Sequence, residues 1–452
     1  MPFHNYIANL EKLIGNKFKN SKFNIDGWMF DETGRFELNE KDEIIKLKIV
    51  GQKLNEIPQP IFEIETLEEL SLEENNISEI PNKLKSLTNL RYLSLANNIF
   101  KKFPMQIALL ENLETLNITG NNITDLPCKI RDIKSLLELN ISQNNIKTLP
   151  ECIDNYSNLS YLNLSQCGLK KLPKHFSNLL NLQELDLSNN NFEEIPDAIS
   201  KLPNLYRLYM TDNEITKINP NIFSSSKLEF LNLGFNKIIE IPEEIENLHK
   251  IRTLAFDYNK IEKLPQSISK IGTIRKLDLA GNKVNKFSKE LTNLQNLQEL
   301  NLMNCNITNI PKEISNMKML RILLLMENNI KIIPNEICEL KNLIHLELGM
   351  NEIEKIPSNI NKLQHLQTLS LSNNYIKIIP SQISELHYLK ELDLANNELD
   401  FLPAFITKLN LQINFDANED GILLHNNPIN YPPLSIIKEG NIAIEKFFKE
   451  NE

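Results

Sequence analysis

The sequence predicts an α/β solenoid, a stack of short turns that share one parallel sheet and are capped at both ends. Two observations predict it. A motif of the form apolar-x-x-Leu-x-Leu-x-x-Asn-x-Ile-x-x-Ile-Pro recurs from Ile44 to Pro403, and its central leucine repeats every 23 residues from Leu70 to Leu231. A fixed short period is typical of stacked repeats, whereas the length of 452 residues alone would indicate two or three globular domains.

Each position of the motif has a structural task. The x-Leu-x-Leu-x segment predicts a short strand whose leucines point inward and whose x residues point outward, because side chains alternate along a strand. The next Asn, as in Asn75 and Asn98, is expected to bond backbone groups at the bend that leaves the strand. The proline, as in Pro81, starts a return segment too short for a regular α-helix, so short helical or 3-10 turns are expected on the convex side.

Three regions follow from the repeat. Residues 1–43 lack it and form an N-terminal cap, in which apolar spacing predicts a helix near residues 4–18 and two apolar-rich runs over residues 27–38 predict a hairpin that includes Trp28. Residues 44–403 hold about 16 repeats of 23 residues. Residues 404–452 form a C-terminal cap, where an amphipathic helix from about Asn441 would cover the last turn.

Composition limits the classes of function. The chain is 41% hydrophobic with a net charge of −10, so a nucleic-acid or anionic-membrane surface is not expected. No apolar run is long enough for a membrane span, and the N-terminus lacks the features of a secretion signal. The five cysteines form no CxxC pair and are interpreted as reduced structural thiols, which predicts a cytoplasmic location.

The sequence shows no catalytic constellation. The carboxylate pairs Glu184 with Asp186 and Glu391 with Asp393 belong to the repeated strand segment, and the seven histidines are scattered without ligand spacing. We therefore predict that the protein is not an enzyme and has no metal or other cofactor.

The motif resembles the leucine-rich repeat proteins, specifically the 23-residue class with Pro after the Asn-x-Ile-x-x-Ile bend that includes Ras-group and Roco-type proteins. The likeness covers residues 44–403, and the tail from Asn427 to Phe447 looks like the segment that closes such arrays, often before a GTPase domain. No Gly-x-x-x-x-Gly-Lys-Ser/Thr motif occurs, so no GTPase domain is expected. The resemblance implies a leucine-rich repeat horseshoe with a concave parallel sheet, acting as an intracellular scaffold or regulator in small-GTPase or phosphatase signalling.

The candidate binding residues are the outward x positions, which folding leaves free to vary. Most turns keep them small or polar, as at Ser94, Ala96, Ser370 and Ser372. Two stretches instead carry residue types that are enriched in interface cores, namely Arg207, Tyr209, Phe230, Phe235 and Tyr258, and then Met303, Ile322, Leu324, Met326, His345 and Met350. Exposed on consecutive strands, they would form a patch for a protein partner. Alternatively, Phe235, Tyr258 and Met350 lean back over the bend and pack there.

Carboxylates also line the predicted inner face, from Glu184 to Asp393. They either select a basic partner or serve only as solvated charge. Three functions therefore stay open: a scaffold for a protein partner such as a small GTPase, a small-molecule or glycan sensor on the same face, and a structural repeat protein without a dedicated ligand. The sequence identifies neither the partner nor the oligomeric state.

Overall fold

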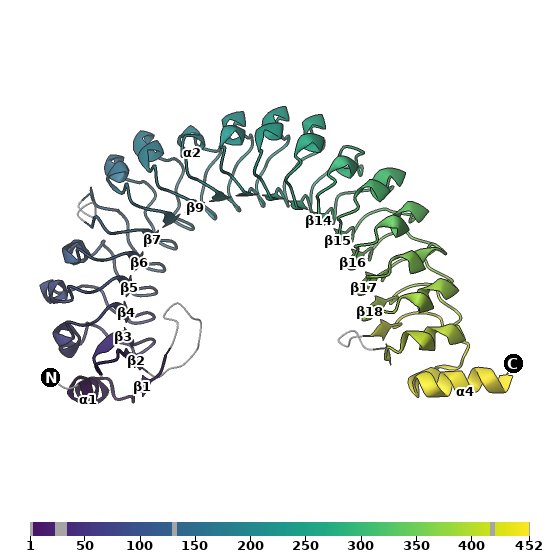
Figure 1. Ribbon diagram of the computed structural model, residues 1–452, viewed down its shortest axis with the longest axis horizontal. Helices are drawn as coiled ribbons and strands as arrows, with labels where there is room; N and C mark the ends of the chain where they lie inside the picture. The colour runs from purple at the N-terminus through teal and green to yellow at the C-terminus, as the bar shows by residue number, and fades with distance from the viewer. Residues whose placement is uncertain (1–2, 23–33, 129–132, 416–420, 452) are drawn as a thin grey trace. The chain divides into compact units, whose positions relative to one another are not determined.

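The computed structural model describes residues 3–22, 34–128, 133–415 and 421–451, and the chain divides into two compact units, Met1–Ile215 (unit 1) and Thr216–Glu452 (unit 2). Each unit is a solenoid of the predicted kind. Within a unit the strands line the inner side and the short helical turns line the outer side (Figure 1). The face of each sheet that carries the outward x residues is called the open face below.

The sheet of unit 1 begins with a hairpin and continues as a parallel ladder. β2 pairs antiparallel with β3, β1 pairs parallel with β2, and from β3 onward each strand pairs in parallel with the next, so that equivalent leucines such as Leu47, Leu70 and Leu93 stand side by side. The strands are β1 Lys19–Asn20, β2 Arg35–Leu38, β3 Ile44–Lys48, β4 Glu69–Ser71, β5 Tyr92–Ser94, β6 Thr115–Asn117, β7 Glu138–Asn140, β8 Tyr161–Asn163, β9 Glu184–Asp186 and β10 Arg207–Tyr209.

The N-terminal helix differs from the prediction in its end point. Helix α1, Phe3–Ile14, ends four residues before the predicted end at residue 18, because Gly15 adopts a left-handed backbone (φ 82°) and closes the helix by donating its amide to the carbonyl of Glu11 (2.8 Å). The first run of the predicted hairpin, with Trp28, lies outside the described residues. Its second run is β2, which pairs with β1 on one side and, antiparallel, with β3, the first strand of the repeat array, on the other.

Unit 2 carries a ladder of the same kind from β11 to β18. Its strands are β11 Phe230–Asn232, β12 Thr253–Ala255, β13 Lys276–Asp278, β14 Glu299–Asn301, β15 Ile322–Leu324, β16 His345–Glu347, β17 Thr368–Ser370, β18 Glu391–Asp393, β19 Ile413–Asn414 and β20 Ile422–Leu423. The ladder extends past Pro403, since Leu392 of β18 pairs with Ile422 of β20. The helices α3, Leu434–Lys438, and α4, Asn441–Asn451, follow and cover the end of the array.

Among the described residues the return segments are short 3-10 turns, as the sequence predicts, except for the short α-helix α2, Asp197–Ser200. In unit 1 the 3-10 turns are η1 Gln59–Glu63, η2 Asn82–Ser86, η3 Met105–Leu109, η5 Glu151–Asn155 and η6 Lys174–Asn178. In unit 2 they are η7 Pro220–Ser224, η8 Glu243–Asn247, η9 Gln266–Lys270, η10 Leu291–Asn293, η11 Lys312–Asn316, η12 Asn335–Glu339, η13 Ile360–Lys362, η14 Ser381–Glu385 and η15 Ala404–Leu409.

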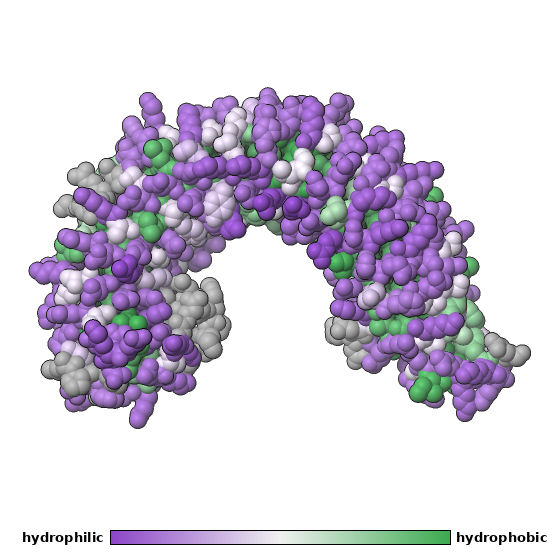
Figure 2. Space-filling model, viewed as in Figure 1, coloured by the Kyte–Doolittle hydropathy of each residue, from purple (hydrophilic) through white to green (hydrophobic). Residues whose placement is uncertain are grey.

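The core of each unit lies between strands and return turns. The leucines and isoleucines of the motif are buried, and five phenylalanines are fully enclosed: Phe100, Phe176, Phe192, Phe223 and Phe256. Hydrophilic residues dominate the visible surface, and hydrophobic ones show between them as separate patches (Figure 2). Burial of this apolar core is the main stabilising term.

The motif Asn forms the predicted ladder at the bend. Asn98 is a typical member: its Nδ2 donates to the carbonyls of Leu72 (3.0 Å), Leu95 and Ala96 (both 3.1 Å), and its Oδ1 accepts from the amide of Ile77 (3.0 Å). Each buried side chain thus pairs backbone groups of its own and the preceding turn, groups that would each cost about 1–3 kcal/mol if left unpaired.

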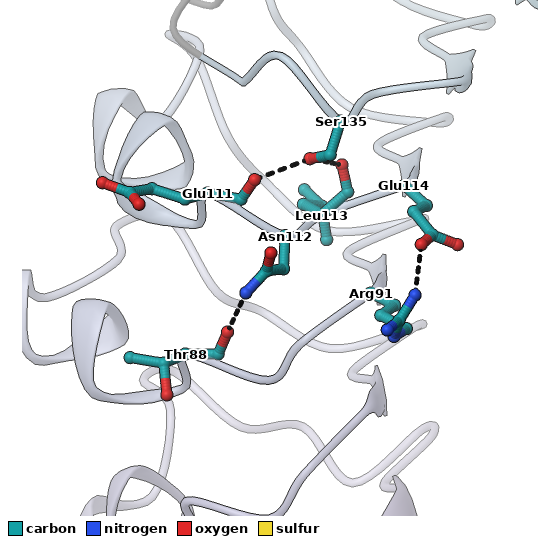
Figure 3. Close-up of polar contacts among 7 residues, drawn as sticks. All are labelled: Thr88, Arg91, Glu111, Asn112, Leu113, Glu114 and Ser135. Atoms are coloured by element: carbon teal, nitrogen blue, oxygen red, sulfur yellow. Dashed lines mark hydrogen bonds and ion pairs between the residues drawn. The ribbon is translucent and has the colours of Figure 1, made fainter.

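A second asparagine ladder, which the motif did not include, connects the return segments. Asn112 Nδ2 donates to the carbonyl of Thr88 (2.9 Å), and Ser135 Oγ takes the same place one turn later by donating to the carbonyl of Glu111 (2.8 Å) (Figure 3). The bond spans 24 residues each time. The asparagines that make it are Asn89, Asn112, Asn158, Asn181, Asn204, Asn296 and Asn342.

Candidate binding surface

The open face of unit 1 is polar. Ion pairs connect residues at equivalent positions of neighbouring turns. Arg91 pairs with Glu114 (Figure 3), and Arg207 Nη1 lies 3.4 Å from Glu184 Oε2. Of the predicted residues, Arg207 and Tyr209 both lie on β10. Arg207 is exposed and paired with Glu184, and Tyr209 is half-buried. These two predicted residues belong to unit 1, and the other nine belong to unit 2.

The most apolar part of the open face of unit 2 is a column on β15. Ile322, Leu324 and Met326 are alternate residues of one strand and its extension, and all three are half-buried. β14 places Glu299 beside Ile322, and β16 places Glu347 beside Leu324. The structure therefore brings together the predicted residues of this stretch, with Met303 one turn before the column and His345 one turn after it.

The residue that precedes the ladder Asn has a left-handed backbone in every turn of unit 2. Asn, Gly or Glu occupies this position in most of them, but Phe235 (φ 52°), Tyr258 (φ 49°) and Met350 (φ 54°) carry large apolar side chains there. Their exposed fractions are 52%, 42% and 49%. These side chains are therefore partly exposed. For Phe235 and Tyr258 the alternative that they pack over the bend holds in part, because the two rings contact each other and the Tyr258 ring lies against Gly281 of the neighbouring bend. Positive φ is uncommon for bulky residues, so it is the residue type at these three turns, and not the backbone conformation, that departs from the rest of the array.

Phe235 and Tyr258 pack against each other at the surface. Their rings are stacked, with centroids 4.6 Å apart and planes 18° from parallel. The Tyr258 ring also lies close to the backbone of Gly281, where an added Cβ would lie 2.6 Å from Tyr258 Cδ1. The absence of a side chain at Gly281 is thus a condition for this ring position, and nothing in the repeat motif pointed to it. Phe230, on β11, is half-buried and lies in register with Thr253.

Carboxylates stand beside these apolar groups in partly desolvated positions. Burial raises the pKa of Asp257, and the charge of Asp278 raises it further. Burial is also the main cause that raises the pKa of Asp278 and of Glu347. Asp257 fits because Gly234 in the preceding turn has no side chain, where a Cβ would lie 2.3 Å from Asp257 Oδ1. A partly desolvated carboxylate is stabilised by an approaching cation.

The cysteines require a correction. Cys128 and Cys152 form a disulfide with a Cα–Cα distance of 5.8 Å, so the prediction that all five thiols are reduced is wrong for this pair. Cys167, Cys305 and Cys338 are free and buried, and burial raises their pKa to about 11, 11 and 12. Cys167 and Cys305 replace the ladder Asn, as their Sγ contacts with the carbonyls of Ile141 (3.4 Å) and Leu279 (3.1 Å) show.

The described residues contain neither a group of three or more His, Cys, Asp or Glu side chains placed to hold a metal ion, nor a helix with the length and apolar character needed to cross a bilayer.

Sequence comparison identifies the class. Family models match the chain in four descriptions: "Leucine rich repeat" at residues 43–100 and 203–261, "Leucine-rich repeat region" at 82–160, "Leucine Rich repeats (2 copies)" at 180–222 and 364–413, and "Leucine Rich Repeat" at 158–179 and 296–317. The chain belongs to the leucine-rich repeat proteins. Such repeats generally form a protein- or peptide-binding surface and are usually not enzymes, and no catalytic domain matches. Among curated proteins, no sequence matches this chain.

Several solved structures are similar. A leucine-rich repeat protein of Leptospira interrogans is 31% identical, with a TM-score of 0.72, covering 87% of this chain and 93% of its own. The plant peptide hormone receptor RGFR1, solved in complex with RGF2, is 26% identical with a TM-score of 0.65, covering 84% of this chain and 62% of the receptor. Drosophila Toll, in complex with Spätzle, is 23% identical with a TM-score of 0.68 over 82% of this chain and 52% of its own, and shows the fold alone.

Proposed function

We propose that this chain is an interaction scaffold that binds a protein or peptide partner on the open face of unit 2, centred on β14–β16. The observation that carries the proposal is the apolar column of Ile322, Leu324 and Met326 on β15. The fold does not require apolar residues there, since the turn of β17 has Thr368, Ser370 and Ser372 at equivalent positions. An apolar patch bordered by polar and acidic groups is typical of a protein interface.

The peptide-hormone complex of RGFR1 supports a peptide or protein ligand for this class of repeat surface. A small GTPase or phosphatase partner follows only from the resemblance to Ras-group repeats and stays a prediction. The cytoplasmic location also stays a prediction. It depended partly on reduced cysteines, and the Cys128–Cys152 disulfide argues against a reduced state because disulfides persist mainly in oxidising compartments.

Affinity capture tests the proposal. The immobilised chain is incubated with an extract of its source cells, and captured proteins are identified by mass spectrometry. We expect Leu324→Glu to abolish saturable capture of a partner while the unfolding curve changes little, because Leu324 is only half-buried. Leu323→Glu is the contrasting control, since Leu323 is fully buried and the charge would unfold the turn. A Leu324→Glu chain that captures the same proteins as the unmodified chain contradicts this assignment.

A further inference from the structure

The two apolar stretches of unit 2 are joined along the ends of its strands. At the ends of the strands, backbone hydrogen bonds connect each turn to the next. In each bond an amide donates to a carbonyl one turn later: Tyr258 to Ala280 (2.6 Å), Gly281 to Met303 (2.8 Å), Asn304 to Met326 (3.0 Å) and Glu327 to Gly349 (3.1 Å). Ala280, Met303, Met326 and Gly349 therefore occupy one position in consecutive turns. Together with Tyr258 at one end and Met350 at the other, we call these residues the strand-end track.

The ends of the track are its most exposed members. The ring of Tyr258 contacts the ring of Phe235 and lies close to the backbone of Gly281, and Met350 is exposed at the bend after β16. The track crosses four strand spacings of about 4.8 Å, or roughly 19 Å. At about 3.3 Å per residue, an extended segment of about six residues spans that distance.

Carboxylates outnumber cations in the strand segments that carry the track. The seven six-residue segments that begin at the first residues of β12–β18 contain one lysine, Lys276, which lies 2.8 Å from Glu299 and is paired with it. The same segments contain seven carboxylates: Asp257, Asp278, Glu299, Glu327, Glu347, Glu391 and Asp393. A second copy of this chain, with a net charge of −10 and the same acidic face, is thus a poor occupant.

We propose that the strand-end track binds an extended segment of a partner protein in which apolar residues alternate with lysine or arginine. The inference rests on the proposed function and specifies the partner's chemistry. The apolar side chains of the segment cover Met303 and Met326 between the ends formed by Tyr258 and Met350. Its cations approach Asp257 and Asp278 near one end and Glu327 and Glu347 near the other.

Peptide titration tests this chemistry. The probe is a fluorescein-labelled peptide in which leucine alternates with lysine over about six residues, and its counterpart has glutamate in place of lysine. Fluorescence anisotropy is measured with the full chain at low and moderate salt. We expect the lysine peptide to bind at least about tenfold more tightly than the glutamate peptide, with a preference that weakens as salt rises.

The test variant is Tyr258→Asn combined with Met326→Ser and Met350→Asn. Each change installs a residue that another turn already carries at that position, Asn304, Ser372 and Asn373 respectively, so the fold is kept. We expect it to bind the lysine peptide about tenfold more weakly or worse. Asp257→Asn should weaken binding and reduce its salt dependence. Ile378→Ser, which changes an apolar residue that is 76% exposed outside the track, is the matched control and should bind normally.

Three results overturn the inference: equal affinity for the two peptides, normal peptide binding by the triple variant, or a self-association in sedimentation that the triple variant removes. Failure of the proposed function looks different. If a cellular partner is captured in a Leu324-dependent way but the triple variant captures it equally well, the track inference fails while the proposed function stands. If the chain captures no partner, the proposed function itself fails.

Discussion

The ring of Tyr258 stacks on that of Phe235 at a centroid distance of 4.6 Å, although both residues have left-handed backbones. A left-handed backbone is unfavourable by about 1–2 kcal/mol for most residues, and asparagine and glycine tolerate it best. An aromatic pair gains only about 0.5–1.5 kcal/mol beyond the area it buries. Stacking alone does not offset this backbone cost, which agrees with the binding role proposed above for Tyr258.

Replacing both rings should leave the fold intact. We expect Phe235→Asn combined with Tyr258→Asn to unfold in urea within about 1 kcal/mol of the unmodified chain, because the lost stacking is offset by relief of the backbone. Phe256→Ala, in the same turn as Tyr258 but fully buried, should instead lose about 3–5 kcal/mol. An asparagine double variant as unstable as Phe256→Ala would show that the rings are structural.

The ladder asparagine should tolerate cysteine better than leucine. Asn351 Nδ2 donates to the carbonyls of Leu325 (2.9 Å), Leu348 (3.0 Å) and Gly349 (3.1 Å), and Oδ1 accepts from Ile330 N (3.0 Å). Asn351→Leu leaves these groups unpaired, and we expect a loss of about 3 kcal/mol or more in unfolding free energy. Asn351→Cys should lose clearly less, since Cys167 and Cys305 hold this position naturally. Equal losses in chemical unfolding would contradict the role assigned to the ladder.

The period of 23 residues was sufficient to predict the fold, because each fixed residue type of the motif has one structural role in a stacked turn. The ladder of Asn98 and the return turn after Pro104 follow directly from it. The strand Ile422–Leu423 was missed because it comes 30 residues after its partner segment on β18, which hides it from any search at the fixed period.

The site was only partly predictable. Outward residues such as Leu324 could be selected because strand alternation gives their direction. The exposure of Phe235 and Tyr258 could not be predicted, because the sequence does not show that their backbone is left-handed or that Gly281 leaves room for a ring. The Cys128–Cys152 bond was missed for a related reason: a separation of 24 residues places the two cysteines on neighbouring return segments, which only the stacking reveals.

Thiol titration should report three thiols in the unfolded, unreduced chain and five after reduction. In the folded chain at pH 8 we expect almost none to react, because Cys167, Cys305 and Cys338 are buried with pKa values raised to about 11–12. Cys128→Ser with Cys152→Ser should lower the unfolding free energy by about 3 kcal/mol, the loop-closure term for this separation. Five thiols without reductant would refute the bond and favour the cytoplasmic prediction.

The pH dependence of the unfolding free energy should differ in sign between a variant at Asp257 and a variant at Glu243. Burial, and then the charge of Asp278, raises the pKa of Asp257 above its ordinary value of 3.8 in the folded chain. Its stabilising contribution is therefore fully present below that value and is lost as pH rises through the folded pKa. Asn does not titrate, so the unfolding free energy of Asp257→Asn relative to the unmodified chain should rise from about pH 4 upward and then level off.

Glu243 gives the opposite case within the same unit. Its carboxylate accepts from the amides of Ser267 (2.9 Å) and Gln266 (3.2 Å), and the bond from Ser267 is the main cause that lowers its pKa below 4.5. This carboxylate stabilises the fold above that value and loses its effect as pH falls, so Glu243→Gln should lose stability relative to the unmodified chain as pH rises. Urea unfolding at a series of pH values measures both differences. A difference for Asp257→Asn that falls as pH rises would show that burial and the charge of Asp278 do not raise the pKa of Asp257, and the electrostatic basis for a cationic partner would be lost.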